Sequence, residues 1–166
     1  MILTAIVDSI EPAALPIMTT EEILKEITSR DTTMVWKAAC EIISLGQNRD
    51  EILPLITHIN EIKETTRGLS MGGGFAPNQR FLDYALRIIE FHKNNSSCTC
   101  KLYLDKYECN DPNKEANKGN IIIEDITRFE DRWIDYYITK CQKCGQKFKT
   151  IEREGHYTWW EWTSIK

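Results

Sequence analysis

Two pairs of cysteines are the residues of this sequence whose spacing points most clearly to chemistry. The first pair is Cys98-Thr99-Cys100, and the second is Cys141-Gln142-Lys143-Cys144, followed by Gly145. A tetrahedral zinc ion takes four thiolate or imidazole ligands, and two cysteines on one tight turn supply two of them. Gly145 lets the backbone bend after the second pair, as in a zinc-ribbon knuckle. The sequence therefore predicts one zinc ion per chain, held by Cys98, Cys100, Cys141 and Cys144.

This predicted zinc site is structural rather than catalytic. Catalytic zinc keeps one position open for water and usually has histidine or carboxylate ligands, whereas four thiolates fill the coordination shell. The zinc-deaminase signature, His-x-Glu followed by Pro-Cys-x-x-Cys, is absent from the sequence. His156 remains an alternative ligand that could take the place of one thiolate. Cys40 is expected to be a small buried residue of a helix, and Cys109 a free thiol in a polar turn.

Other patterns that could carry catalysis lack the elements they need. A redox role for Cys141 and Cys144 requires a strand followed by a helix N-terminus, and no such pattern surrounds them. The segment Gly68-Leu69-Ser70-Met71-Gly72 matches the nucleophile elbow of hydrolases, but a predicted helix rather than a strand precedes it. The glycine run Gly72–Gly74 lacks the Gly-Lys-Ser/Thr ending of a phosphate-binding loop. We therefore predict that the protein is not an enzyme.

The elements that precede the cysteines are predicted to be helices. From residue 18 to residue 95 the apolar side chains recur with the period of an α-helix. The helix expected to begin at Asp31 should end at Gly46, in the left-handed conformation. The helix expected to begin at Asn48 should continue to Gly68. The result is a small helical bundle whose hairpins resemble HEAT repeats. The expected helices begin at Thr19, Asp31, Asn48 and Asn78.

The residues from 96 to 166 predict an antiparallel sheet that carries the zinc site. Runs rich in β-branched and aromatic side chains alternate there with turn residues such as Asp111-Pro112-Asn113. The expected fold class is therefore α+β, with a helical domain at 18–95, a zinc-bound β domain at 96–166 and a loosely ordered leader at 1–17. The expected strands cover 101–104, 120–126, 133–139, 147–153 and 157–162.

Composition and charge limit the classes of function that the protein can have. The chain has 166 residues, and no stretch approaches the ~18 apolar residues of a membrane span. The leader carries no positive charge and makes a poor signal peptide, so we expect a cytoplasmic protein, where reduced thiols favour metal binding. The net charge of −4 argues against a nucleic-acid partner. Residues 1–97 hold 9 basic and 13 acidic groups and residues 98–166 hold 12 of each, so the helical half carries the excess negative charge.

Three tryptophans lie within four positions near the C-terminus. On a strand, Trp160 and Trp162 share one face and Trp159 points to the other. At least one of these faces must be core. The other can present an aromatic anchor to a partner protein or a platform on which single-stranded bases stack.

Several motifs between residues 32 and 162 carry a resemblance to a known kind of protein. They are the two cysteine pairs, Thr66-Arg67-Gly68-Leu69, Gly72-Gly73, Pro77-Asn78-Gln79-Arg80 and His156-Tyr157-Thr158-Trp159-Trp160-x-Trp162. These motifs resemble those of small bacterial immunity proteins from contact-dependent growth inhibition and polymorphic toxin systems. The resemblance implies a non-catalytic protein that neutralises a toxin domain by tight, specific binding.

The leading expectation is thus an immunity protein whose acidic half covers a basic toxin surface. Its candidate partner-binding residues are four acidic side chains, two arginines and the three tryptophans: Asp50, Glu51, Glu61, Glu64, Arg67, Arg80, Trp159, Trp160 and Trp162. The alternative is a zinc-ribbon module that binds nucleic acid or has a regulatory role. It would use the tryptophans together with Lys140, Lys143, Lys147 and Lys149.

Overall fold

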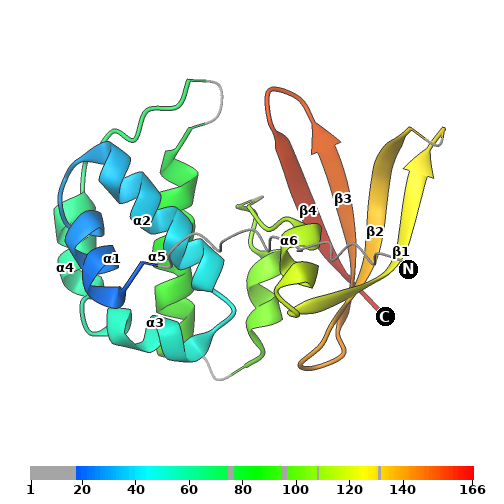
Figure 1. Ribbon diagram of the computed structural model, residues 1–166, viewed down its shortest axis with the longest axis horizontal. Coiled ribbons are helices and arrows are strands. Elements are labelled where there is room, and N and C mark those ends of the chain that lie inside the picture. Colours follow the sequence, from blue (N-terminus) through cyan, green and yellow to red (C-terminus); the bar gives the residue numbers. More distant parts are fainter. Residues whose placement is uncertain (1–17, 75–76, 95–96, 108, 131) are drawn as a thin grey trace, which may run out of the picture.

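The computed structural model describes residues 18–74, 77–94, 97–107, 109–130 and 132–166. Helices make up the N-terminal part of the chain, and a four-stranded antiparallel sheet makes up the C-terminal part (Figure 1). The predicted α+β class is therefore confirmed. The leader expected at residues 1–17 lies outside the described residues.

The first three of the five N-terminal helices begin where the capping residues predict. The Thr19 hydroxyl accepts from the Glu22 backbone N–H in a capping box, Asp31 accepts from the N–H groups of Thr33 and Met34, and Asn48 accepts from that of Asp50. Each helix turns its apolar stripe towards the others. These helices are α1 (Thr20–Ile27), α2 (Thr32–Leu45), α3 (Arg49–Ile56), α4 (Ile59–Thr66) and α5 (Gln79–Asn94).

The single helix expected from Asn48 to Gly68 is wrong, because the chain forms α3 and α4 there instead. Pro54 lies inside α3, where it has no N–H to donate and its ring crowds the preceding turn. The helix ends two residues later, and the Thr57 hydroxyl donates to the Pro54 carbonyl at 3.1 Å. The His58 carbonyl then accepts the first bond of α4, from the Ile62 N–H at 2.9 Å.

The left-handed conformation expected at Gly46 is also wrong. Gly46 has a φ of −55°, in the right-handed region that any residue adopts. A Cβ atom at this position would lie 2.9 Å from Cδ1 of Ile88 on α5 and 3.2 Å from the carbonyl oxygen of Ile43. Glycine is present here because the end of α2 approaches α5 closely, and not because of its backbone freedom.

The C-terminal sheet has the strand order β1-β2-β3-β4, with antiparallel pairing between neighbours. Four of the five expected strands are confirmed, as β1 (Ile121–Phe129), β2 (Trp133–Cys141), β3 (Lys147–Glu154) and β4 (Thr158–Ile165). The fifth, expected at 101–104, is instead the 3-10 helix η1 (Thr99–Leu104), in which the Lys101 N–H donates to the Cys98 carbonyl. The turn expected at 111–113 opens a short helix, α6 (Pro112–Asn117), which Asp111 caps.

Two apolar cores lie side by side, and η1 contributes to both. The helical core includes Ile42, Leu55 and Ile88, whereas the sheet core is built around Phe148 and includes two of the cysteines. Within η1, Leu102 packs into the helical core and the next residue, Tyr103, packs into the sheet core. Because consecutive side chains of a 3-10 turn splay apart, this short segment connects the two halves.

Candidate metal centre

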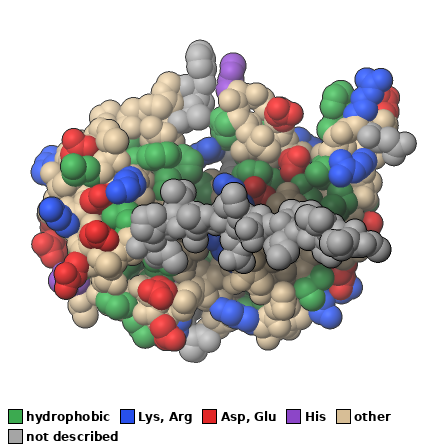
Figure 2. All heavy atoms as spheres, in the orientation of Figure 1, with side chains coloured by type: hydrophobic (Ala, Val, Ile, Leu, Met, Phe, Trp, Pro, Cys, Tyr) green, Lys and Arg blue, Asp and Glu red, His purple; other side chains and the backbone are tan. Residues whose placement is uncertain are grey.

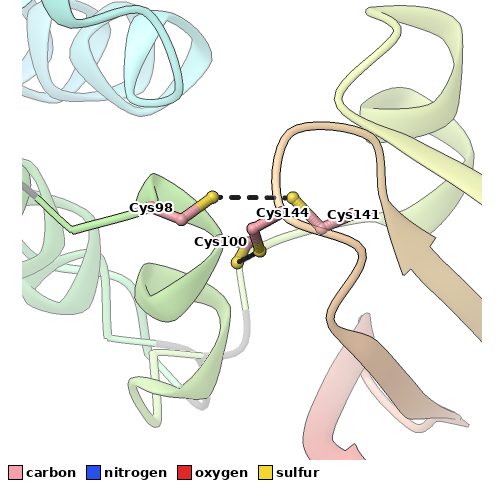
Figure 3. Close-up of side chains that lie close together, drawn as sticks. All are labelled: Cys98, Cys100, Cys141 and Cys144. Atoms are coloured by element: carbon pink, nitrogen blue, oxygen red, sulfur yellow. Dashed lines mark hydrogen bonds between the residues drawn. The ribbon is translucent and has the colours of Figure 1, made fainter.

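The four cysteines come from two turns that face each other between the halves (Figure 3). Cys98 is the N-cap residue of η1, and Cys100 lies within its first turn. Cys141 ends β2, and Cys144 follows it in the turn that leads to β3. That turn closes when the Gly145 N–H donates to the Cys141 carbonyl at 2.9 Å, and Gly145 adopts the predicted bend with a φ of +76°.

The geometry of the four thiols fits a tetrahedral ion. Their Sγ atoms all lie within 4.8 Å of one another. Cys98 Sγ is 3.6 Å from Cys141 Sγ, and Cys100 Sγ is 3.5 Å from Cys144 Sγ, so each short contact joins one pair to the other. Four sulfur atoms at 2.3 Å from a tetrahedral ion would be about 3.8 Å apart. The cluster could therefore hold a metal ion of the kind that prefers four sulfur ligands, such as zinc or iron.

Burial sets the protonation of two of these thiols. Burial raises the pKa of Cys98 and that of Cys100, so without a positive partner both would stay protonated at neutral pH. For Cys144 burial acts in the same direction, but hydrogen bonds from the Gln146 backbone N–H and from the neighbouring thiols outweigh it and lower the pKa. A coordinated metal ion deprotonates thiols outright and would supply the missing positive charge.

Gln47, in the short connection between α2 and α3, touches both cysteine turns. Its side-chain amide donates to the carbonyl of Thr99, which lies between the cysteines of the first pair, at 3.2 Å. Its own backbone carbonyl accepts from Nζ of Lys143, which lies between those of the second pair, at 2.8 Å. Gln47 and Thr99 are both buried. Gln47, just after α2, is therefore hydrogen-bonded to both turns of the cysteine cluster.

The remaining cysteines and His156 stand apart from this cluster. Among the described residues, the group that could hold a metal ion consists of the four predicted cysteines alone. Cys40 lies half-buried on α2, and the Cys109 thiol donates to the Tyr107 carbonyl at 3.1 Å. His156 is exposed at the turn between β3 and β4. The structure thus brings together the four predicted cysteine ligands and not the histidine alternative.

The four predicted acidic residues all lie on exposed surfaces of α3 and α4. Asp50 and Glu51 lie in the first turn of α3, where negative charge also stabilises the helix dipole. On α4, Glu61 lies 3.2 Å from Nδ1 of His58, and Glu64 lies 2.5 Å from Nη2 of Arg67. Acidic side chains are spread over the helical half on the face shown in Figure 2.

Of the two predicted arginines, Arg67 lies beside Glu64, whereas Arg80 contacts the sheet half, to which the tryptophans belong. Arg80, near the start of α5, stacks on Tyr157 of the sheet half, with its Cζ atom 4.2 Å from the ring centroid. Trp162 is buried and stacks on Tyr103 at 4.4 Å between centroids. Trp160 shares its face and donates from Nε1 to Glu152 at 3.2 Å. These two tryptophans are therefore part of the sheet core, while Trp159 lies on the opposite face of β4, as its position in the strand predicts.

The four lysines of the nucleic-acid alternative have separate roles. Lys143 is attached to Gln47, as described above. Strand register places Lys140 opposite Lys147, whose Nζ lies 2.6 Å from Glu124. Lys149 follows on β3, with Nζ 4.0 Å from the ring centroid of Tyr136. Three of the four lysines thus share one face of the sheet.

The structure also reveals residues that no sequence motif marks. Gln47 has only its position between two helices to distinguish it, and its contacts depend on how the halves pack. Phe129 and Trp133 are the most exposed large hydrophobic side chains of the described chain, at 55% and 58%. They flank the charged turn between β1 and β2. Two aromatic residues beside a charged hairpin turn are the sequence signal for these exposed side chains.

None of the helices in the described ranges is long and apolar enough to cross a membrane. No protein-family model matches the chain, and no curated protein or solved structure is significantly similar to it.

Proposed function

We propose that the cysteine cluster binds one structural zinc ion and that the protein is a non-catalytic immunity protein that neutralises a basic toxin domain. Four thiolates leave no coordination position for a substrate or a reactive water molecule, which supports a structural role for the ion. The ion would hold η1 against the β2–β3 turn, and its binding energy would contribute directly to folding.

The observation that supports the binding role best is that α3 and α4 are amphipathic. Ile52 and Leu55 of α3, and Ile59 and Ile62 of α4, are buried in the helical core. The exposed faces of the same helices carry the four predicted acidic residues, in the half of the chain that holds the excess negative charge. Such a surface complements a domain that is basic because it handles nucleic-acid phosphate.

This acidic surface is proposed to act mainly on the rate of association. A single exposed ion pair contributes only about 0–1 kcal/mol, so one substitution has little effect on the complex. Together, the carboxylates steer a basic partner to the surface and make association sensitive to salt.

The test is to reverse Asp50, Glu51, Glu61 and Glu64 together to lysine and to measure binding to the toxin domain encoded by the neighbouring gene. We expect an association rate lower by about tenfold or more and a weaker dependence on salt. The matched control reverses the same number of exposed acidic residues elsewhere: Glu21, Asp125, Glu130 and Glu161. Unchanged association in the first variant, or equal loss in both, would reject the acidic-surface model.

The lysine-bearing face of the sheet favours a second candidate function, that of a nucleic-acid-binding module. Lys140, Lys147 and Lys149 lie there beside Tyr136, and lysines beside an aromatic ring can track a single strand. Against this, Lys147 is paired with Glu124 and the whole chain is acidic.

We therefore predict no binding of single-stranded DNA or RNA at physiological salt. A labelled oligonucleotide titrated in fluorescence anisotropy checks this. Micromolar or tighter binding that falls steeply with salt would make the nucleic-acid module the better account.

A further inference from the structure

A pocket of about 360 Å³ lies beside the turn between β1 and β2. Its walls come from the β1–β2 hairpin and from the end of β3. Figure 2 shows apolar, basic and acidic side chains together at the end of this hairpin, in the upper right of the view. The lining residues are Phe129, Trp133, Ile134, Asp135, Glu152, Arg153 and Glu154.

The aromatic wall of this pocket is largely exposed to solvent. Phe129 pairs directly with Trp133 in the strand register, at the first pair of the hairpin. Each ring is more than half exposed, whereas Phe148 and Tyr137 of the same sheet are fully buried. Leaving two large aromatic side chains in water forgoes the stabilisation that their burial would give. Exposed aromatic side chains beside a pocket are typical of a recognition surface.

The charged wall of the pocket is negative on balance. Three carboxylates line it, against one guanidinium, that of Arg153. Arg153 lies 3.2 Å from Asp135 and is thereby largely neutralised. Glu152 is oriented by the Tyr137 hydroxyl at 2.7 Å and by the Trp160 Nε1–H at 3.2 Å, and both bonds reach the same carboxylate oxygen. Glu154 is exposed at the mouth of the pocket.

We propose that this pocket binds an arginine side chain of a partner protein. A guanidinium group can lie against the indole of Trp133, since a cation is attracted to the face of an aromatic ring and tryptophan binds it best. Its N–H groups can donate to Glu154 and to the free oxygen of Glu152. The negative balance of the pocket opposes a phosphate group and therefore a nucleic acid.

This site is independent of the acidic surface on α3 and α4. In Figure 1 those helices lie at one end of the long axis, and the β1–β2 hairpin lies at the other. The pocket therefore provides a second interaction surface, which a basic loop of another protein would occupy.

The experiment follows the indole N–H signal of Trp133 by nuclear magnetic resonance, with the signal assigned from a Trp133→Phe variant. The probe is the blocked pentapeptide Gly-Gly-Arg-Gly-Gly, and its control replaces arginine by citrulline, which has the same shape without the charge. We expect a saturable shift in the millimolar range with arginine and none with citrulline. Because Glu154 and Trp133 each contribute one contact, Glu154→Gln and Trp133→Ala should each weaken binding about three- to fivefold. Since Trp133→Ala lacks the indole, binding to that variant is measured from the backbone amide signals of the hairpin.

The matched control variant is Glu161→Gln, which removes an exposed acidic residue of β4 that does not line the pocket. It should bind the arginine peptide as the unchanged protein does. Equal shifts with both peptides, or no saturable shift, would overturn the proposal. A Trp133 shift that depends on protein concentration alone would instead assign the surface to a second copy of the chain, and a larger shift with an oligonucleotide would assign it to nucleic acid.

Discussion

The six cysteines of the chain show how much the surroundings of a single residue decide its chemistry. Burial raises the pKa of Cys40 to about 11, so its thiol stays protonated and behaves as a small apolar group. The four clustered thiols are each within reach of the others, which makes a shared cation their natural partner. The sequence spacing separates these two kinds of cysteine, because the ligands of a zinc-ribbon site come in pairs a few residues apart.

At the same scale, His92 provides a test of the helical core. The residue is 1% exposed, and its Nε2–H donates to the Gly46 carbonyl at 2.8 Å. Its Nδ1 atom has no hydrogen-bond partner among the described residues. Burial lowers the pKa of His92 below its usual 6.5, so the folded protein keeps the ring neutral while the unfolded chain takes up a proton.

We predict that the free energy of unfolding is insensitive to His92 above pH 6.5 and falls as the pH drops from there towards the lower pKa of the folded state. The loss should grow until the pH reaches the folded-state pKa and level off below it. His92→Gln keeps an N–H donor for Gly46 and should remove this component, as measured by urea unfolding at several pH values. The exposed His58→Gln serves as the control. A pH dependence that is equal in both variants contradicts a neutral, buried His92.

At the scale of elements, local signals predicted most of the fold. Caps such as Asp31 and alternating strands such as β2 depend on neighbours in the sequence, and both kinds of element were confirmed. The segment Lys101–Leu104 was not predictable in this way. Its neighbouring side chains Leu102 and Tyr103 enter different cores, and only the packing of the two halves requires that. Pro54 carried a local signal for the end of α3, but the length of the apolar pattern concealed it.

The candidate site, like the fold, was predictable only where its residues lie close together in the sequence. The ligand set follows from spacing, whereas the contact of Gln47 with both cysteine turns joins residues 52 and 96 positions apart along the chain. A hydrogen bond between such distant residues has no signature in a single sequence. It arises only once α2 and the sheet are in place.

We predict that Gln47→Ala lowers the affinity for zinc by about tenfold, because residues that hold a ligand loop in place typically have effects of this size. Competition with a chromophoric chelator measures the affinity. Gln79→Ala removes an amide of equal size on α5, which donates to Asp83 and not to a cysteine turn, and should leave the affinity unchanged. If both variants bind zinc equally well, the connection to α2 does not position the metal site.

At the scale of the whole molecule, the two halves are joined by several independent contacts. Nζ of Lys118 donates to the Ser44 carbonyl at 2.9 Å, at the end of α2. Nε1 of Trp162 donates to the Asn110 carbonyl at 2.9 Å, and the amide of Asn110 donates to the hydroxyl of Tyr84 on α5 at 2.7 Å. A metal ion at the cysteine cluster would fix η1, which packs into both cores, to the β2–β3 turn. Loss of the metal should therefore loosen the halves together rather than the sheet alone.

The central claim is that four thiolates hold one zinc ion at the junction of the halves. X-ray absorption at the zinc edge, together with elemental analysis of the purified protein, tests it most directly. We predict one zinc per chain with four sulfur neighbours at about 2.3 Å, lost in Cys141→Ser and kept in Cys40→Ser. Nitrogen or oxygen neighbours in the shell, or full zinc content in a Cys98→Ser, Cys100→Ser double variant, would contradict the claim.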